Sequence, residues 1–433
     1  MNLSVRTRLS TMMALIYAAQ GAFWPLLALH LGDLGFSGRE RSWIFATYPL
    51  AAIATSLGAG AVVDRLMPSQ RYVSLCFGLG TGLLVCVSTG WPSAALPLFV
   101  LFLVYWLIIA PTYGIANSIA FRNLARPQVE FGRVRMWGTV GWMFAGWLVS
   151  VLMAMSGSGR AGQGAYAAFA LAAVLSAAVA GFVLFLPNTP PLAVGGGTSS
   201  LKTAATLLRS RSICVYLVTA FGVSLTTPFV FQAMPPYLES LGLPRAWAAT
   251  ALTIGQWPEI VALAGLPLLL KRFGFKTTLA VGMVAWLIRF ASLAIRPPLW
   301  LAIAGIPLHG IGIACFTVGG QVFLDSRAPF DRRAGAQAVN MTITSGFGAL
   351  LGSLLAGDLQ TRFGGNYSAI FFVPCLIHVG LIGFFILGFR PNVELVGCTT
   401  VAVFDQPARV SPREEPCPVV AGVVLLAMES ADG

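Results

Sequence analysis

The sequence is poor in charged residues, which make up only 10% of its 433 positions. A soluble protein of this length typically has about a quarter of its residues charged, because water must cover its surface. Hydrophobic residues instead account for 57% of the chain, and the mean hydropathy is +0.80. The shortage of charge excludes an ordinary soluble fold, and we expect lipid to cover most of the molecule.

Other absences exclude whole classes of function. The seven cysteines show no paired spacing, so we predict neither a disulfide framework nor a metal site. No GxxxxGK(S/T) loop is present to bind nucleotide phosphates, and no nucleophile–base constellation appears, so we expect no enzyme activity and no cofactor. The net charge of +12 comes in short clusters between apolar runs, which does not fit a surface that binds nucleic acid.

Long apolar runs are what the sequence has in abundance. A bilayer core requires ~20 apolar residues per helix. Runs of that order occur in two sets of six, at roughly 9–31, 42–63, 72–90, 95–120, 136–155 and 165–187, and then at 212–236, 246–270, 277–295, 299–324, 336–357 and 368–389. The first run is too long for a signal peptide and lacks a small-residue cleavage site, so we expect it to be retained as a membrane helix.

These runs predict an all-α polytopic membrane protein with twelve transmembrane helices in two six-helix, pseudo-symmetric bundles. We expect the bundles at 1–187 and 212–390, joined by a cytoplasmic linker at 188–211 that is rich in Pro, Gly and Ser. The stretch 391–433 has scattered Pro and charged residues and no run of spanning length, so we predict a disordered cytoplasmic tail.

The distribution of basic residues predicts the orientation in the membrane. Most of the 27 Lys and Arg residues fall in segments on the same side as the N-terminus, where the positive-inside rule places the cytoplasm. The exceptions in outer loops are Arg39, Arg41, Arg160, Arg245, Arg296 and Arg362. We therefore expect both termini in the cytoplasm, as an even number of helices requires, and a bacterial inner membrane as the location.

The two halves also resemble each other. Arg126 and Glu130 follow the fourth run, and Arg327 and Asp331 follow the tenth. Glycines recur in the fifth and eleventh runs, where they let helices approach closely in lipid. Related six-helix halves are typical of the major facilitator architecture, whose solute site lies between the halves near the bilayer midplane.

Specific motifs carry the resemblance further. The segment Gly60-x-x-x-Asp64-Arg65 resembles the loop motif of major facilitator proteins, in which the acid and the base hold helix ends together on the cytoplasmic side. Longer stretches are similar, in chain order, to the nucleoside:proton symporter family of that superfamily: NSIAFRNL, FGRVRMWGTVGW, GQWPEIVAL, VAWLIRFA, GQVFLDSRAP and GAQAVNMTITSGFGALLGSLLAG. The resemblance covers most of residues 1–390 and implies proton-coupled nucleoside uptake.

Glu259 is the main candidate for chemistry. It lies about a dozen residues from either end of the predicted eighth span, where a charge costs ~2.5–3.5 kcal/mol and usually faces a cavity. Gln256 lies one turn earlier on the same face, and Pro258 between them should disturb the backbone. A carboxyl that only holds helices together is the alternative. The family resemblance implies that Gln256 and Glu259 contact the nucleoside and that Glu259 couples transport to protons.

The fifth span presents a second candidate surface. Arg135, Thr139 and Trp142 lie at i, i+4 and i+7 and therefore share one helix face. They offer fixed guanidinium donors, a hydroxyl group and a flat ring on which an aromatic solute can stack. From its position alone Arg135 is equally well explained as a cytoplasmic anchor, but the resemblance implies that this arginine and threonine face the substrate.

Three further polar residues lie within predicted spans. His309 is either a donor or proton relay in the cavity or a satisfied buried histidine, and Gln232 matches a position where the family has amide side chains. Arg289 either pairs with Glu259 across a helix interface or extends outward to water, and the sequence does not choose between these arrangements.

The chain departs from the family pattern in the tenth span. The family has an acidic residue shortly after the pair that corresponds to His309–Gly310, whereas this chain has Ala314 there and no acid before Gln321. The amides of the seventh span are partly replaced by Phe231 and prolines. Both departures bear on proton coupling and on solute specificity.

We therefore predict a proton-coupled secondary transporter that imports nucleosides by alternating access, as a monomer whose partners are the solute, protons and lipid. One alternative retains the fold and transports an aromatic acid, a sugar or a drug-like compound. The other is a membrane receptor without transport activity. The persistence of Glu259, Gln256 and Arg289 and the lack of a large regulatory domain argue against the receptor.

Overall fold

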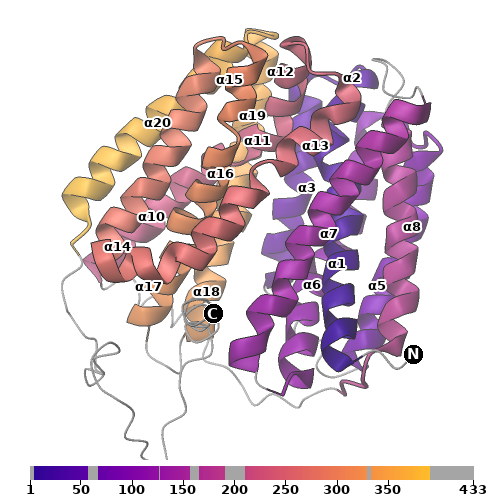
Figure 1. Cartoon of the computed structure of the whole chain (residues 1–433). Helices are drawn as coiled ribbons and strands as arrows, with labels where there is room; N and C mark the ends of the chain where they lie inside the picture. The colour runs from indigo at the N-terminus through magenta and orange to yellow at the C-terminus, as the bar shows by residue number, and fades with distance from the viewer. Residues whose placement is uncertain are drawn as a thin grey trace, which may run out of the picture.

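The computed structural model describes residues 4–56, 67–125, 127–156, 165–190, 210–328 and 333–390. Within these ranges all regular secondary structure is helical (Figure 1). Ten of the described helical segments are long and apolar enough to cross a membrane. The predicted all-α membrane architecture is thus confirmed, while the number of twelve spans stays a prediction.

The N-terminal half is built from α-helices with two short 3₁₀ turns. Its elements are α1 (Val5–Phe23), η1 (Trp24–Leu26), α2 (Leu27–Asp33), α3 (Gly38–Ser56), α5 (Ser69–Ser88), α6 (Ala95–Asn123), α7 (Pro127–Ser156), α8 (Tyr166–Phe182) and η2 (Val183–Phe185). The predicted second span is described only as far as Ser56, and the loop motif of Gly60, Asp64 and Arg65 lies outside the described residues.

The C-terminal half contains shorter helical pieces. They are α10 (Arg211–Thr226), α11 (Pro228–Gln232), α12 (Met234–Ser240), η3 (Arg245–Trp247), α13 (Ala248–Thr253), α14 (Gln256–Ala294), α15 (Leu299–Ala304), α16 (Pro307–Gly312), η4 (Ile313–Val318), α17 (Gly319–Arg327), α18 (Arg333–Met341), η6 (Thr342–Gly348), α19 (Ala349–Phe363) and α20 (Tyr367–Gly388). The predicted linker 188–211 is described only at its ends, and the tail 391–433 lies outside the described residues.

Two predicted spans run together in α14. The helix continues through the predicted loop between 270 and 277, and its one departure from helical geometry is at Gly274, where φ is +71°. Glycine adopts this left-handed conformation without the penalty that a Cβ atom would cause. Gly274 therefore lets the chain change direction without a separate connecting loop.

Breaks in the helices concentrate in the C-terminal half. The predicted seventh span is divided among α10, α11 and α12, and the tenth among α15, α16, η4 and α17. The η4 and η6 segments are π-helical, a form that occurs mostly as short bulges and often at functional sites. Transporters commonly form their solute sites from such interrupted helices, because a break frees backbone groups and redirects side chains.

Buried apolar side chains form two clusters, one mainly in α1–α8 and one in α10–α20. The division is not complete, because Ala246, Ala248 and Ala249 of the C-terminal half belong to the first cluster. They do so because α13 packs on α7, where a Cβ atom on Gly146 would come within 3.0 Å of the Thr253 methyl group. In Figure 1 the two halves meet near α2, α12 and α13 and their ribbons diverge toward the end that carries the N-terminus.

Candidate functional site

Glu259 lies in the first turn of α14, directly after an interruption between α13 and α14 at Ile254 and Gly255. Pro258 fits there because the first turn of a helix does not need its N–H groups for internal hydrogen bonds. A helix N-terminus carries a partial positive charge, which favours a carboxylate. The disturbance that the sequence predicts around Pro258 thus takes the form of a new helix start that carries Glu259 in its first turn.

Glycine brings the tenth predicted span against this helix start. A Cβ atom on Gly310 would overlap the backbone of Glu259, and one on Gly255 would lie 3.4 Å from Cβ of His309. The α14 and α16 backbones therefore touch at the level of Glu259. His309 comes beside the carboxyl-bearing turn because small residues remove the intervening side chains.

The carboxyl group of Glu259 is not engaged by another described side chain. Its side chain is half-buried, and within the described residues it has no hydrogen bond or ion pair. The basic side chain that acts on it electrostatically is Arg135 of α7, which belongs to the opposite half. An acid and a base from the two halves thus face the same region without closing on each other.

Arg135 is held by aromatic residues of the N-terminal half. Its Cζ atom lies 4.1 Å from the centroid of the Tyr17 ring, a cation–π contact. Tyr17 in turn contacts Tyr113 at 5.2 Å between centroids, and the Tyr113 hydroxyl donates to Gln20 Oε1 at 2.6 Å. This arrangement places the guanidinium group against the Tyr17 ring, between α1 and α7.

The packing of α1 on α7 sets the positions of Tyr17, Arg135 and Trp142. A Cβ atom on Gly141 would overlap the Ala14 carbonyl group, and one on Gly21 would come within 2.9 Å of the Trp142 Cα. Close approach of these two helices places Tyr17 beside Arg135. It also turns Trp142 toward α11, where its ring centroid lies 6.5 Å from that of Phe231.

Phe231 extends the aromatic surface across the two halves. Its ring also lies 6.3 Å from that of Trp24, and Trp24 contacts Trp106 at 5.3 Å. Phe231 therefore contributes an aromatic face at a position where the family pattern has an amide. The replacement adds stacking area and removes a hydrogen-bonding group from that point.

The remaining candidates do not all meet at one point. Thr139 is half-buried on the same helix as Arg135, and the Gln256 amide, turned so that its nitrogen faces the carbonyl groups of Thr253 and Leu252, donates to them at 3.0 and 3.1 Å. His309 is half-buried, with its Nδ1 atom out of solvent. Gln232 is only 1% exposed and neither of its amide atoms has a hydrogen-bond partner.

Arg289 contradicts both arrangements considered from the sequence. It is 1% exposed, which excludes extension to water, and its Nη2 atom donates to Met234 Sδ at 3.0 Å instead of to Glu259. The pairing with Glu259 fails because Arg289 points into the interior of the C-terminal half, whereas Glu259 faces Arg135 across the halves.

An ion-pair cluster joins the halves at the end away from the N-terminus. Arg245 Nη2 lies 2.5 Å from Asp33 Oδ2, and Arg245 Nη1 lies 3.3 Å from Glu239 Oε1. The side chains of Arg245 and Asp33 are only 5% and 8% exposed. Because Asp33 ends α2 and Arg245 begins η3, this cluster, which we name the buried latch, connects the N-terminal and C-terminal halves.

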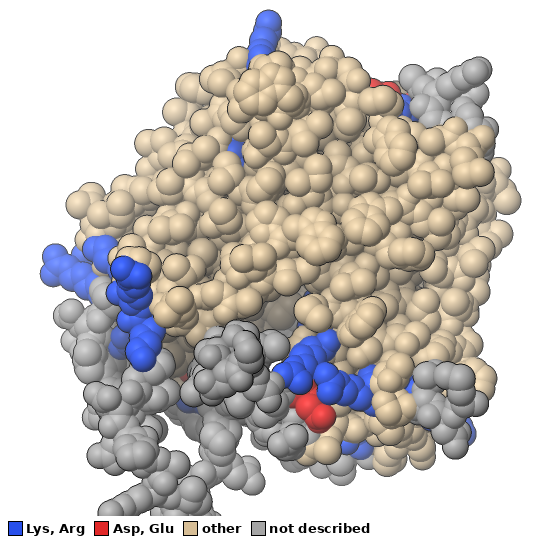
Figure 2. Space-filling model, viewed as in Figure 1, with Lys and Arg blue, Asp and Glu red and all other residues tan. Residues whose placement is uncertain are grey.

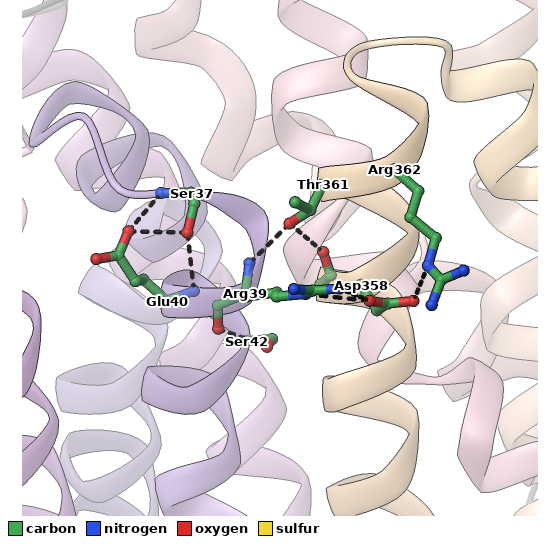
Figure 3. A network of polar contacts seen from close by, with 8 residues as sticks. Ser37, Arg39, Glu40, Ser42, Asp358, Thr361 and Arg362 are labelled. Carbon is green, nitrogen blue, oxygen red and sulfur yellow. Dashed lines mark hydrogen bonds and ion pairs between the residues drawn. The ribbon is translucent and has the colours of Figure 1, made fainter.

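A second connection at the same end is exposed to solvent (Figure 3). Arg39 Nη2 of α3 lies 2.8 Å from Asp358 Oδ1 of α19, and the Arg39 backbone N–H donates to Thr361 Oγ1 at 3.0 Å. Arg362 also contacts Asp358, at 2.5 Å. Since the Arg39 side chain is 62% exposed, water screens this ion pair far more than it screens the buried latch.

Sequence reasoning missed Tyr17, Gln20, Tyr113 and the buried latch. A weak signal existed for the first group, because Tyr17, Gln20 and Trp24 follow helical spacing and Gln20 is a polar residue within an apolar span. No such signal existed for the latch, since its partners come from segments about two hundred positions apart.

The side chains that the two halves contribute here offer the chemical groups that an uncharged aromatic solute would need. Arg135 offers donors from one side, the Glu259 carboxyl offers acceptors or a proton from the other, and Trp142 and Phe231 supply ring faces. Within the described residues no group of three or more metal-ligating side chains occurs.

Comparisons with known proteins agree with the overall fold. The model of the family described as "Nucleoside H+ symporter" matches residues 1–394. YegT of Escherichia coli, a candidate nucleoside transporter by its name, is 30% identical over 365 residues, which cover 82% of this chain and 84% of YegT. The xanthosine permease of Escherichia coli is 26% identical and covers 90% of this chain and 97% of its own length. The crystal structure of the nucleoside transporter NupG has a TM-score of 0.79 at 22% identity, covering 90% of this chain and 100% of that chain.

Proposed function

Because this chain belongs to the nucleoside H+ symporter family, we propose that it imports nucleosides together with protons by alternating access. The family expected from the sequence motifs is thereby confirmed, and so is the membrane transporter fold. The family is one of transporters and not of enzymes. The single structural observation that supports the proposed activity is the electrostatic action of Arg135 of the N-terminal half on Glu259 of the C-terminal half, without an ion pair between them.

The proposed site explains how a nucleoside would be recognised. The base would stack on Trp142 and Phe231, and the sugar hydroxyl groups and base edge would reach Arg135, Thr139, Gln256 and Glu259. Such groups discriminate strongly, because a solute that leaves a buried donor or acceptor unpaired loses ~1–3 kcal/mol of binding. Residues 1–187 and 212–390 would move as two halves around this site, and one chain would contain a complete site as a monomer.

The proposed location is a bacterial inner membrane with both termini in the cytoplasm. Figure 2 supports this orientation on the face it shows, because Lys and Arg gather at the end that carries the N-terminus in Figure 1 and a broad uncharged band lies above them. Basic residues at that end match the charge bias of cytoplasmic loops.

Uptake measurements test the proposed activity. Cells or proteoliposomes that contain the protein are expected to accumulate labelled uridine or adenosine, and a protonophore should abolish the accumulation because it removes the driving gradient. Vesicles without the protein are the control. Accumulation of a sugar or an aromatic acid with no response to any nucleoside would contradict the proposed solute, and uptake unaffected by the protonophore would contradict the coupling.

The buried latch provides a test of alternating access. Arg245→Met removes the buried ion pair between Arg245 and Asp33, which joins the two halves and is proposed to stabilise the conformation closed at the outer end. Spin labels at the exposed positions Ser93 and Ser240, one in each half, should therefore report a longer distance in the variant.

Arg39→Met is the matched control, because it breaks an exposed ion pair between the same two halves. Its label distances should stay close to those of the parent protein. If Arg245→Met remains folded and its label distances are also unchanged, the buried latch does not hold the outer end closed.

A further inference from the structure

Arg289 is a buried cation without a counter-charge. Its Nε and Nη1 atoms have no hydrogen-bond partner, and Nη2 contacts only the thioether sulfur of Met234. Arginine stays protonated in proteins, so this charge cannot be removed by releasing a proton. A buried charge without an ionic partner costs several kcal/mol. Within the described residues no carboxylate lies at ion-pair distance to supply that partner.

The groups around Arg289 add donors instead of acceptors. Trp286 lies one turn earlier in α14, with its ring centroid 5.6 Å from the Arg289 Cζ atom. Its indole Nε1–H is also buried without a partner. A cation–π contact with a desolvated ring provides about 2 kcal/mol, which is less than the cost of burying the charge. Trp286 therefore adds a second unmatched donor while offsetting only part of the charge.

A third polar group comes from the neighbouring helix. The His309 ring of α16 meets the Trp286 ring edge-on at 5.0 Å between centroids, and Arg289 lies close enough to His309 to act on it electrostatically. The Nδ1 atom of His309 is buried without a partner. The His378 ring centroid lies 6.4 Å from that of Trp286; its Nδ1 atom bonds the Pro374 carbonyl at 3.0 Å, and its Nε2 atom is buried without a partner.

Excess buried donors around a fixed positive charge are complementary to a small anion. We propose that the C-terminal half binds a monovalent inorganic anion of the size of chloride between Arg289, Trp286 and His309. The anion accepts hydrogen bonds from the guanidinium and indole N–H groups and neutralises the charge of Arg289. It thereby joins α14 to α16. Arg289 and Trp286 lie on α14 of the C-terminal half, whereas Arg135 and Trp142 lie on α7 of the N-terminal half.

Thermal unfolding in chloride and in gluconate at equal ionic strength tests the proposal. A ligand that binds only the folded state stabilises it in proportion to its saturation, so replacing gluconate with chloride should raise the Tm by about 3 °C. Arg289→Gln should abolish the difference between the two salts. Arg135→Gln removes the arginine of the central site and should retain the difference, which excludes binding at that site as the cause.

Substitutions of Met234 keep the proposal testable if Arg289→Gln fails to fold. Met234→Glu places a carboxylate where the sulfur accepts from Arg289, so it should raise the Tm in gluconate and make the protein insensitive to chloride. Met234→Gln is the uncharged match and should stay sensitive.

Soaking crystals with bromide should place an anomalous scattering peak beside the Arg289 guanidinium group. Equal Tm values for the parent protein in chloride and in gluconate, or a chloride response retained in Arg289→Gln, would overturn the proposal. These readouts require no transported solute, so failure of the anion site and failure of the proposed nucleoside transport are distinguishable.

Discussion

Glu259→Gln is expected to abolish proton-driven accumulation of nucleoside while leaving solute exchange intact. Glutamine retains the shape and hydrogen-bonding capacity of glutamate but carries no exchangeable proton at this position. One proton that moves through a membrane potential of about 100 mV provides about 2.3 kcal/mol, which corresponds to roughly fifty-fold accumulation. The variant should fall to a ratio of about one in proteoliposomes that carry an imposed acid-outside gradient.

The proposed coupling depends on where Glu259 lies. Its carboxyl group has no ion-pair partner within the described residues, and Arg135 acts on it from the opposite half. Movement of the two halves would bring Arg135 nearer or farther, which would favour the ionised form in one state and the protonated form in the other. A proton would therefore be taken up and released as the site changes the side to which it opens.

Exchange of labelled for unlabelled uridine separates coupling from binding in this experiment. Exchange should continue in Glu259→Gln, because it needs no net movement of protons. Glu40→Gln is the matched control: Ser37 donates to this exposed carboxylate from its backbone N–H and its hydroxyl group, which holds the pKa of Glu40 below its ordinary value and keeps it ionised. If Glu259→Gln accumulates solute to the parental ratio, Glu259 is not the coupling group.

Arg135→Lys should weaken nucleoside transport strongly although it retains the positive charge. Lysine lacks the planar fork of donors and the ring stacking by which arginine lies over Tyr17, 4.1 Å from the ring centroid. Loss of a hydrogen bond to a charged group costs ~1.5–3 kcal/mol, so KM should rise by about ten-fold to a hundred-fold. Arg135→Gln, which also removes the charge next to Glu259, should lower both transport and its coupling to protons.

Arg272→Lys is the matched control for this series, because Arg272 is exposed at the surface of α14. Its KM should equal that of the parent protein. A parental KM in Arg135→Lys would show that the arginine serves only as an anchor at the membrane surface, which is the alternative that the sequence left open.

Local patterns in the sequence were sufficient for the architecture. Apolar runs of spanning length identify membrane helices because each run must satisfy its own backbone hydrogen bonds in lipid. The spacing of Arg135, Thr139 and Trp142 correctly predicted a shared helix, since 3.6-residue periodicity is a property of one segment. The motif around Glu259 indicated the family, which the match over residues 1–394 confirms.

Contacts between residues of different helices could not be predicted from such local patterns. The sequence offered Glu259 as a partner for Arg289, and the structure instead directs Glu259 toward Arg135 and Arg289 toward Met234. Which residues of two helices meet depends on the crossing angle, rotation and depth of both helices. Here glycines at 141 and 310 set those quantities by allowing backbone contact that a Cβ atom would prevent.

By itself the sequence determined that this protein is an all-α membrane protein and which family it belongs to, because hydropathy and short motifs are carried by single segments. Only the tertiary structure decided that Glu259 begins a helix facing Arg135, that Arg245 joins the halves, and that Arg289 lacks a counter-charge. Those outcomes depend on packing among helices far apart in the chain, where the fit of backbones and side chains selects one pairing from many that the sequence permits.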